Sequence, residues 1–390
     1  MTQFAHWLAS TGTAAFGATY LLAKNVPAGT VGVLLALSGL TSCLTQPLLA
    51  ARADRAKRCI LPQMLLAMSL LCCVCLAAQF LPGLPLAPLA LIYTVGLWST
   101  DAMQPLLSAL SVACNDAGYA VNFGAARGVA AAASALSTLA VGFLIARLGL
   151  LWMLAFLLAA RVLCAVSLCT YPKLPKALPV HAEPDASCSV GQFFARYPRY
   201  CVSLLGVAFL GMFHCMTENY LIAIVAPLGG DSGIVGTALF ISSMVAGPVI
   251  FFFSRIRTRL RDSAILKLAG VSFVIKAVGF LLARSVGTIY ALELLQITSY
   301  ALLAPAQVYY AGSMVRPGDM VKGQAFITAF YALGGACGNF VGGQLLPHGA
   351  QAISLAGIAI AVTGTVILFA TVKRSQKSTE GSAADPAAAP

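Results

Sequence analysis

Seven ionisable residues lie inside long apolar segments of this 390-residue sequence. They are Asp101, Arg127, Arg161, His214, Glu218, Lys276 and Glu293. A charged side chain in the apolar interior of a membrane costs about 3 kcal/mol or more, so such residues tend to pair, to face a water-filled cavity and to carry function. Carboxylates, cations and a histidine in this setting have the chemistry of proton coupling and polar-solute binding.

The spacing and charge of these residues predict how they group. His214 and Glu218 are four residues apart, which places both on one face of a helix, and histidine changes its charge near neutral pH. The seven residues include three carboxylates and three fixed cations, so their charges balance. One alternative stays open, in which these charges form ion pairs that only fix helix packing and His214 is a hydrogen-bonded core residue.

The composition identifies lipid as the solvent of these segments. Hydrophobic residues make up 59% of the chain and charged residues only 9%, whereas soluble domains carry roughly 25% charged residues. The net charge of +12 does not indicate nucleic-acid binding, because the basic residues form short clusters between apolar runs. That distribution is typical of the cytoplasmic loops of membrane proteins.

The motifs of cofactor-dependent proteins are missing. The twelve cysteines are mostly placed in apolar runs, without the paired spacing of metal ligands. The sequence has no glycine-rich loop that ends in Lys and Ser or Thr, so ATP is not expected as the energy source. We therefore expect no metal and no cofactor, and a proton or other ion gradient as the driving force.

Twelve apolar stretches are long enough for transmembrane helices, each of which needs about 20 residues. They cover residues 4–24, 30–51, 59–81, 88–112, 123–146, 149–171, 201–227, 234–254, 263–284, 288–311, 322–346 and 350–372. The sequence thus predicts an all-α integral membrane protein. Its expected parts are an N-terminal six-helix half at 1–171, a cytoplasmic central loop at 172–200, a C-terminal half at 201–372 and a disordered tail at 373–390.

The distribution of lysine and arginine predicts the orientation. These residues are concentrated after the second and eighth stretches, in the central loop and in the tail. The positive-inside rule places those segments and both termini in the cytoplasm. We expect a multi-pass protein of the plasma or inner membrane, with the seven ionisable residues in two clusters, one in each half.

The connection after the second stretch reads AARADRAKR, from Ala50 to Arg58. It resembles the signature of the major facilitator superfamily: Gly, three residues, Asp-Arg, one residue, Gly and then basic residues. Asp54, Arg55 and Arg58 match this signature, whereas Ala50 and Lys57 stand where glycine is usual. The resemblance implies a gating role for the three matching residues on the cytoplasmic side. A solvated basic cluster would explain the arginines equally well.

Two other segments are similar to the lactose-permease and nucleoside-proton-symporter branch of that superfamily. NFGAARGVAAAASA at 122–135 resembles the start of its fifth helix, where Arg127 matches an essential arginine. LAGVSFVIKAVG at 268–279 resembles its ninth helix, with Lys276 in place of the usual arginine. The resemblance implies two pseudo-symmetric halves with a mid-membrane site between them. The first, fourth, seventh and tenth helices would line that site, and they carry four of the seven ionisable residues.

The lactose permease also has coupling residues that this sequence does not share. Its tenth helix has a His and a Glu one turn apart, where this chain reads Gln296-Ile-Thr-Ser299. We therefore predict that the coupling proton binds elsewhere, with Glu293 as the first candidate, Glu218 as the second and Asp101 as the next.

The expected function is proton-coupled uptake of a small polar organic solute, such as a sugar or a nucleoside, by a monomer in a lipid bilayer. The alternative is a proton-driven drug or metabolite efflux antiporter of the same fold. Such antiporters resemble one another in a Gly-Pro motif in helix five, but residues 128–149 contain no proline. A membrane enzyme or receptor is the third class, and no catalytic constellation or soluble domain supports it.

Overall fold

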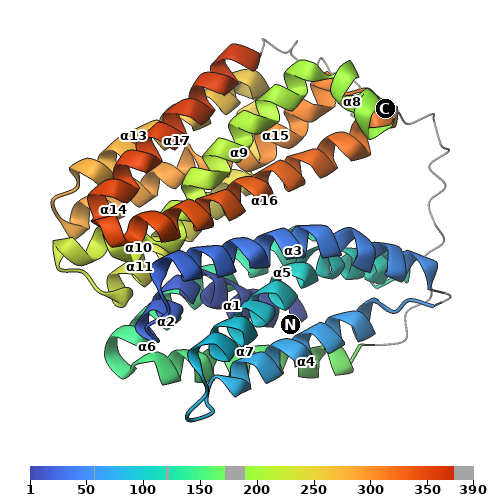
Figure 1. Ribbon diagram of the computed structural model, residues 1–390. Helices are drawn as coiled ribbons and strands as arrows, with labels where there is room; N and C mark the ends of the chain where they lie inside the picture. The colour runs from blue at the N-terminus through green and yellow to red at the C-terminus, as the bar shows by residue number, and fades with distance from the viewer. Residues whose placement is uncertain (57, 120–122, 172–188, 373–390) are drawn as a thin grey trace, which may run out of the picture.

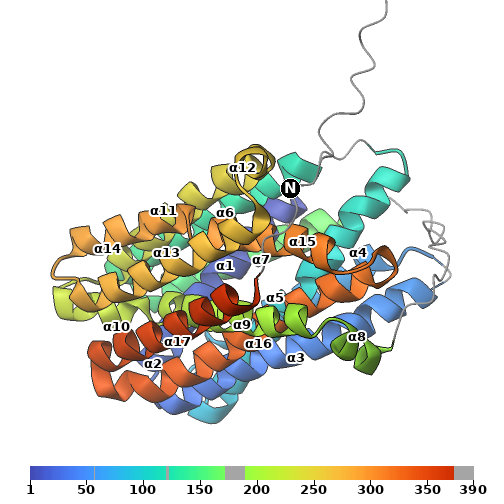
Figure 2. The ribbon, with the colours of Figure 1, turned by 90° about the horizontal axis from the view of Figure 1, so that it is seen from above.

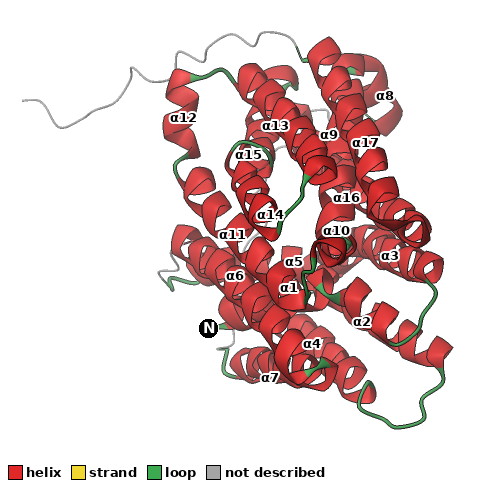
Figure 3. Cartoon of the chain, turned by 90° about the vertical axis from the view of Figure 1, so that its left-hand side faces the viewer, coloured by secondary structure: helices red, strands yellow, loops and turns green. Residues whose placement is uncertain are grey.

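The computed structural model describes residues 1–56, 58–119, 123–171 and 189–372. It describes only the backbone of Asp54, Asp116, residues 123–127, Pro317 and Val321. This part of the chain consists of helices and their connections, without strands (Figure 3). The predicted all-α class is therefore confirmed.

The N-terminal helices form one group, drawn in blue to green in the lower part of Figure 1. They are α1 (Thr2–Ala15), α2 (Gly17–Ala23), α3 (Ala28–Arg55), α4 (Leu61–Ala78), α5 (Leu86–Asp116), α6 (Phe123–Leu148) and α7 (Leu150–Cys169). Helix α1 packs against α5, α6 and α7, which places it in the middle of this group.

The C-terminal helices form the second group, seen from another side in Figure 2. They are α8 (Val190–Arg196), α9 (Pro198–Asn219), α10 (Leu221–Val225), α11 (Ser232–Phe251), α12 (Phe253–Arg259), α13 (Asp262–Leu282), α14 (Val286–Glu293), α15 (Tyr300–Met314), α16 (Met320–Leu345) and α17 (Gly349–Thr371). Helix α9 packs against both α16 and α17, and α13 packs against α15 and α17.

Nine helical stretches among the described residues are long and apolar enough to cross a membrane. The last of them, Lys322–Thr371, is 50 residues long and contains both α16 and α17. Each of the twelve ranges expected from the sequence is mostly helical. The number of helices that cross the membrane and the symmetry of the two halves stay predictions.

Large apolar side chains cover the outer surface of the bundle. Leu44, Leu48, Phe251 and Leu282 are each about two-thirds exposed or more, at 72%, 69%, 70% and 67%. Soluble monomers rarely expose contiguous apolar surface on this scale. Because helices satisfy their own backbone hydrogen bonds, such a surface is stable in lipid.

Glycines bring the two groups of helices into backbone contact. A Cβ atom on Gly32 of α3 would lie 2.8 Å from the carbonyl oxygen of Asn339 in α16. A Cβ atom on Gly142 of α6 would lie 2.7 Å from the Cα of Gly236 in α11. The groups therefore meet along α3–α16, which run side by side in Figure 1, and along α6–α11.

Helix α8 lies within residues 172–200, the segment that the sequence predicts to be the central loop between the halves, and this short helix was not predicted. A capping box between Ser189 and Gln192 starts this helix. Phe193 is fully buried and its ring centroid lies 5.1 Å from that of Phe326 in α16. Arg196 forms an ion pair of 3.2 Å with Asp319, so α8 is fixed to the C-terminal group.

Candidate functional site

A buried ion pair forms the centre of the C-terminal group. The Nζ of Lys276 in α13 donates a 2.8 Å hydrogen bond to the Oε2 of Glu293, the last residue of α14. A second, 3.3 Å bond joins Nζ to the Oε1 of Gln296. The side chains of Lys276 and Glu293 are each only 2% exposed. Lys276 and Glu293 thus form an ion pair, as charged residues inside a membrane tend to do.

An interruption of the helix positions these carboxylate and amide groups. The sequence predicts one continuous helix at 288–311, but α14 ends at Glu293 and a 3-10 turn follows at Leu294–Ile297. Ser299 then has a non-helical backbone, and α15 begins at Tyr300. Discontinuous helices are typical of substrate and ion sites in transporters, where the freed backbone groups line a cavity. The prediction of a continuous helix is therefore wrong here.

His214 and Glu218 lie on one face of α9, as their spacing predicts. The Nε2 of His214 is 3.4 Å from the Oε1 of Glu218. The His214 ring stacks on Tyr300 of α15, with centroids 4.7 Å apart and planes 14° apart. The Glu218 side chain is 32% exposed, whereas that of Glu293 is only 2% exposed.

These two pairs belong to one electrostatic network. The charge of Lys276 acts on both His214 and Glu218. The fields of Glu218 and of Asp101 both act on Cys215, the residue of α9 next to His214. The charge of Asp101, in the N-terminal group, therefore acts on the C-terminal cluster across the boundary between the groups.

The N-terminal cluster surrounds Arg161 of α7, which is fully buried. Its guanidinium contacts the Nδ1 of His6 at 3.1 Å, the Oγ1 of Thr100 at 2.9 Å and the Sδ of Met103 at 3.5 Å. No carboxylate oxygen of the described residues lies within 4.0 Å of Arg161. Arg161 is therefore held by neutral acceptors from α1 and α5 and not by a carboxylate of the described residues.

The remaining predicted site residues are only partly described. Arg127 lies in the first turns of α6, but its side chain is outside the described part of the chain. The same holds for the side chain of Asp54 near the end of α3. Arg55 and Arg58, which flank the end of that helix, are exposed. The proposed roles of these residues stay predictions.

Two residues of these clusters were not predicted from the sequence. His6 is a fully buried ionisable residue inside the first predicted apolar stretch, and its type and position were a usable signal. Gln296 stands in the polar Gln-Ile-Thr-Ser sequence that marks the helix interruption. Its contact with Lys276 depends on the fold and has no signal in the sequence.

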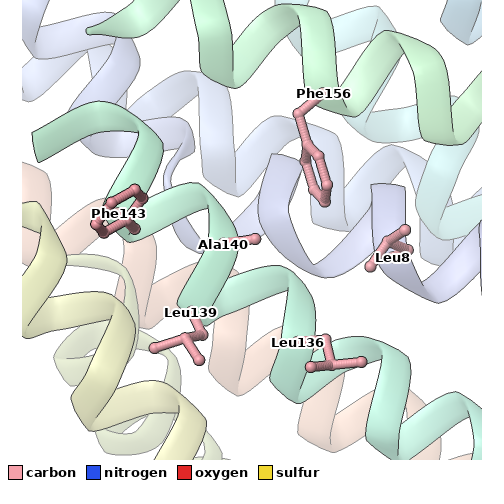
Figure 4. Close-up of a pocket in the computed structure, with 6 residues that line it drawn as sticks. All are labelled: Leu8, Leu136, Leu139, Ala140, Phe143 and Phe156. Carbon is pink, nitrogen blue, oxygen red and sulfur yellow. The ribbon is translucent and has the colours of Figure 1, made fainter. Parts of the chain in front are cut away.

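One cavity of the described part of the chain lies apart from these clusters. It has a volume of about 480 Å³ and lies between α1, α6 and α7 (Figure 4). Its lining is entirely apolar, from Leu8, Leu136, Leu139, Ala140, Phe143 and Phe156. Phe143 is 57% exposed on the outer surface, so this groove faces lipid and contains none of the ionisable residues.

The described residues offer no group of three His, Cys, Asp or Glu side chains that could hold a metal ion. The two clusters contain two buried cations, Lys276 and Arg161, and two half-buried carboxyl groups, Asp101 and Glu218. Glu218 lies beside His214, which stacks on Tyr300. Such an arrangement can bind a polar solute and exchange protons with water.

Comparisons with known proteins identify the relatives of this chain. The model of the MFS_1 like family matches residues 9–356. The structure of a mutant of the nucleoside transporter NupG matches with a TM-score of 0.80 and 13% identity over 95% of this chain and 99% of that one. A second NupG structure matches with a TM-score of 0.74 and 14% identity, over 95% of each chain. No curated protein matches the sequence.

Proposed function

The chain belongs to the MFS_1 like family of major facilitator transporters, and we propose that it takes up a small polar organic solute, such as a sugar or a nucleoside, together with protons. The family makes it a multi-pass membrane transporter and not an enzyme. The observation that carries the proposal is the partly exposed Glu218 beside His214 and near the buried Lys276–Glu293 pair.

Glu218 is our first choice for the coupling proton. The sequence favours Glu293, but that carboxylate is closed off and bonded directly to Lys276. A hydrogen bond between opposite charges is short and geometrically specific, so we assign Glu293 to this contact and not to the transfer of protons. Glu293 then holds Lys276 in position, and Glu218 exchanges its proton with the aqueous cavity.

The proposed cycle uses the charge of Glu218. A proton on this carboxyl group removes its attraction for His214 and Lys276 and leaves an O–H donor that faces the cavity. The loaded site binds the solute, and the two groups of helices rock to expose it to the other side. Release of the proton there restores the negative charge beside His214. Solute and proton therefore cross together.

The aromatic side chains next to this carboxylate support a solute with a flat or ring-shaped body. His214, Tyr300 and Tyr331 form a row, in which the Tyr300 and Tyr331 centroids are 6.1 Å apart. Aromatic faces stack on planar rings or lie against sugar rings. The fold likeness to a nucleoside transporter agrees with a nucleoside, although at 13% identity it concerns the fold alone.

The same proposal includes the architecture that the sequence predicts. Twelve transmembrane helices in two pseudo-symmetric halves would place the site at the middle of the membrane between them. Both termini would be cytoplasmic, in the plasma or inner membrane, and one copy of the chain would suffice. A proton-driven efflux antiporter of the same fold is the second candidate and differs only in the direction of the solute.

Transport by the purified protein in proteoliposomes tests the function. An inwardly directed proton gradient should drive the accumulation of labelled nucleosides or sugars, and a protonophore should abolish it. Accumulation under the opposite gradient would favour the efflux antiporter. If no member of either solute class moves under either gradient, the proposed solute class is wrong.

A further inference from the structure

Arg161 is held by a set of groups unlike that around Lys276. Both cations are buried, but Lys276 has a carboxylate at 2.8 Å, whereas the contacts of Arg161 are an imidazole, a hydroxyl and a thioether. Carboxylates are the strongest acceptors for a guanidinium, because both partners are charged. The use of three neutral acceptors in a membrane interior therefore needs an explanation.

The contact with Arg161 determines the protonation state of the His6 imidazole. A guanidinium has only donors and does not lose its proton in proteins. The His6 Nδ1 at 3.1 Å must therefore be the acceptor, so His6 is neutral and carries its hydrogen on Nε2. Protonation of His6 would place two cations in contact.

A carboxyl group that forms no ion pair with a described residue follows Thr100 in the sequence. Asp101 follows Thr100, the residue whose hydroxyl contacts Arg161, and it feels the charge of Arg161. Nevertheless, no cationic nitrogen of the described residues lies within 4.0 Å of the Asp101 carboxylate. Asp101 is half-buried and lies near Cys215 of the other group of helices.

We propose that His6 is a positioning residue that holds Arg161 away from Asp101. The hydrogen bond from Arg161 to His6 keeps the guanidinium in place and leaves the Asp101 carboxyl group free to take up a proton or a donor group of the solute. Without this acceptor, Arg161 would turn to Asp101 and form a charge-assisted pair. The positions of Arg161 and Asp101 do not depend on the proposed function. Only the use of Asp101 in transport rests on that function.

Whether the Asp101 carboxyl group is paired with Arg161 can be measured without a transport assay. Dicyclohexylcarbodiimide reacts with protonated carboxyl groups in apolar surroundings, and a carboxylate paired with arginine is held ionised and unreactive. The full-length protein in lipid nanodiscs is labelled at one neutral pH, and the modified peptides are quantified by mass spectrometry. Glu218 is the internal control, because its neighbours His214 and Lys276 do not include His6.

In wild type, Asp101 should be labelled. His6→Ala should lower the labelling of Asp101 by about tenfold or more, because a cation within a few ångströms stabilises the ionised, unreactive form. The labelling of Glu218 should not change. His6→Gln should keep the labelling of Asp101, because the amide oxygen accepts the bond from Arg161. Thr2→Ala is the matched control, since it removes a buried hydrogen bond from α1 to Ser167 of α7 without touching Arg161.

The double variant His6→Ala/Arg161→Met should regain labelling, because no guanidinium is left to pair with Asp101. If His6→Ala fails to fold, His6→Phe keeps the ring volume without the acceptor and replaces it. Absence of labelling at Asp101 in wild type, or equal labelling in wild type and His6→Ala, would overturn the proposal. Transport is assayed separately, so an inactive protein with the expected labelling would reject the proposed function alone.

Discussion

At the scale of single residues, the two buried cations show that a membrane interior can stabilise charge in different ways. Lys276 is neutralised by Glu293 and fixed by Gln296. Arg161 keeps its net charge and is solvated by neutral side chains. The ion pair of Lys276 suits a fixed structural contact. The neutral contacts of Arg161 suit a charge that can change partners.

The Lys276–Glu293 pair gives a prediction about stability. Glu293→Gln leaves a buried, uncompensated lysine, and the loss of one partner of a buried pair costs about 3–5 kcal/mol. The thermal midpoint of the purified protein should therefore fall clearly. In Lys276→Met/Glu293→Met no charge is left, so most of this loss should be recovered. Equal destabilisation of the single and double variants would show that the pair does not act as a unit.

At the scale of helices, contacts between elements depend on glycines with defined neighbours. Gly334 and Gly338 of α16 lie against the backbone carbonyl groups of Ala208 and Met212 in α9. Glycines four residues apart therefore allow α16 to approach α9 closely.

A matched pair of glycine substitutions tests this packing. Gly334→Ala would place its Cβ on the Ala208 carbonyl group, so the two helices must separate and stability should fall. A Cβ on Gly247 of α11 meets no atom within 4 Å. Gly247→Ala should therefore be neutral or raise stability by about 0.5–1 kcal/mol, through helix propensity. Similar thermal midpoints for the two variants would contradict the observed α9–α16 contact.

The sequence predicted helices well and their interruptions poorly. Apolar length determines where a helix can cross lipid, so the predicted ranges agree with helices such as α6 and α13. The interruption after Glu293 and the contact between His6 and Arg161 depend on tertiary neighbours. Hydropathy carries no information about such neighbours. The pairing of His214 with Glu218 was predictable because both residues lie on one helix.

At the scale of the whole molecule, the two groups of helices meet along α3–α16 and α6–α11 and have the fold of major facilitator transporters. Movement between these groups would expose the site to each side in turn. The signature-like segment around Asp54 lies at the end of α3, one of the helices along which the two groups meet, and we propose that it acts on this movement.

Asp54→Asn should therefore slow turnover and leave solute binding nearly unchanged. Binding is measured by titration of the purified protein and turnover by exchange in proteoliposomes. Arg52→Gln removes a charge from the same helix end without touching the signature residues and is the matched control. Loss of binding in Asp54→Asn, with normal conformer populations, would contradict a gating role.

The central claim is that Glu218 carries the coupling proton, and a comparison of two transport modes tests it most directly. Solute exchange without a gradient and uphill uptake driven by a proton gradient are measured for wild type, Glu218→Gln and Asp231→Asn. The last variant is the control, because it neutralises an exposed N-cap carboxylate of α11 outside the site, and Asn caps a helix as well as Asp does. Glu218→Gln should retain exchange and lose uphill accumulation. Uphill accumulation in Glu218→Gln at the wild-type level would contradict the claim.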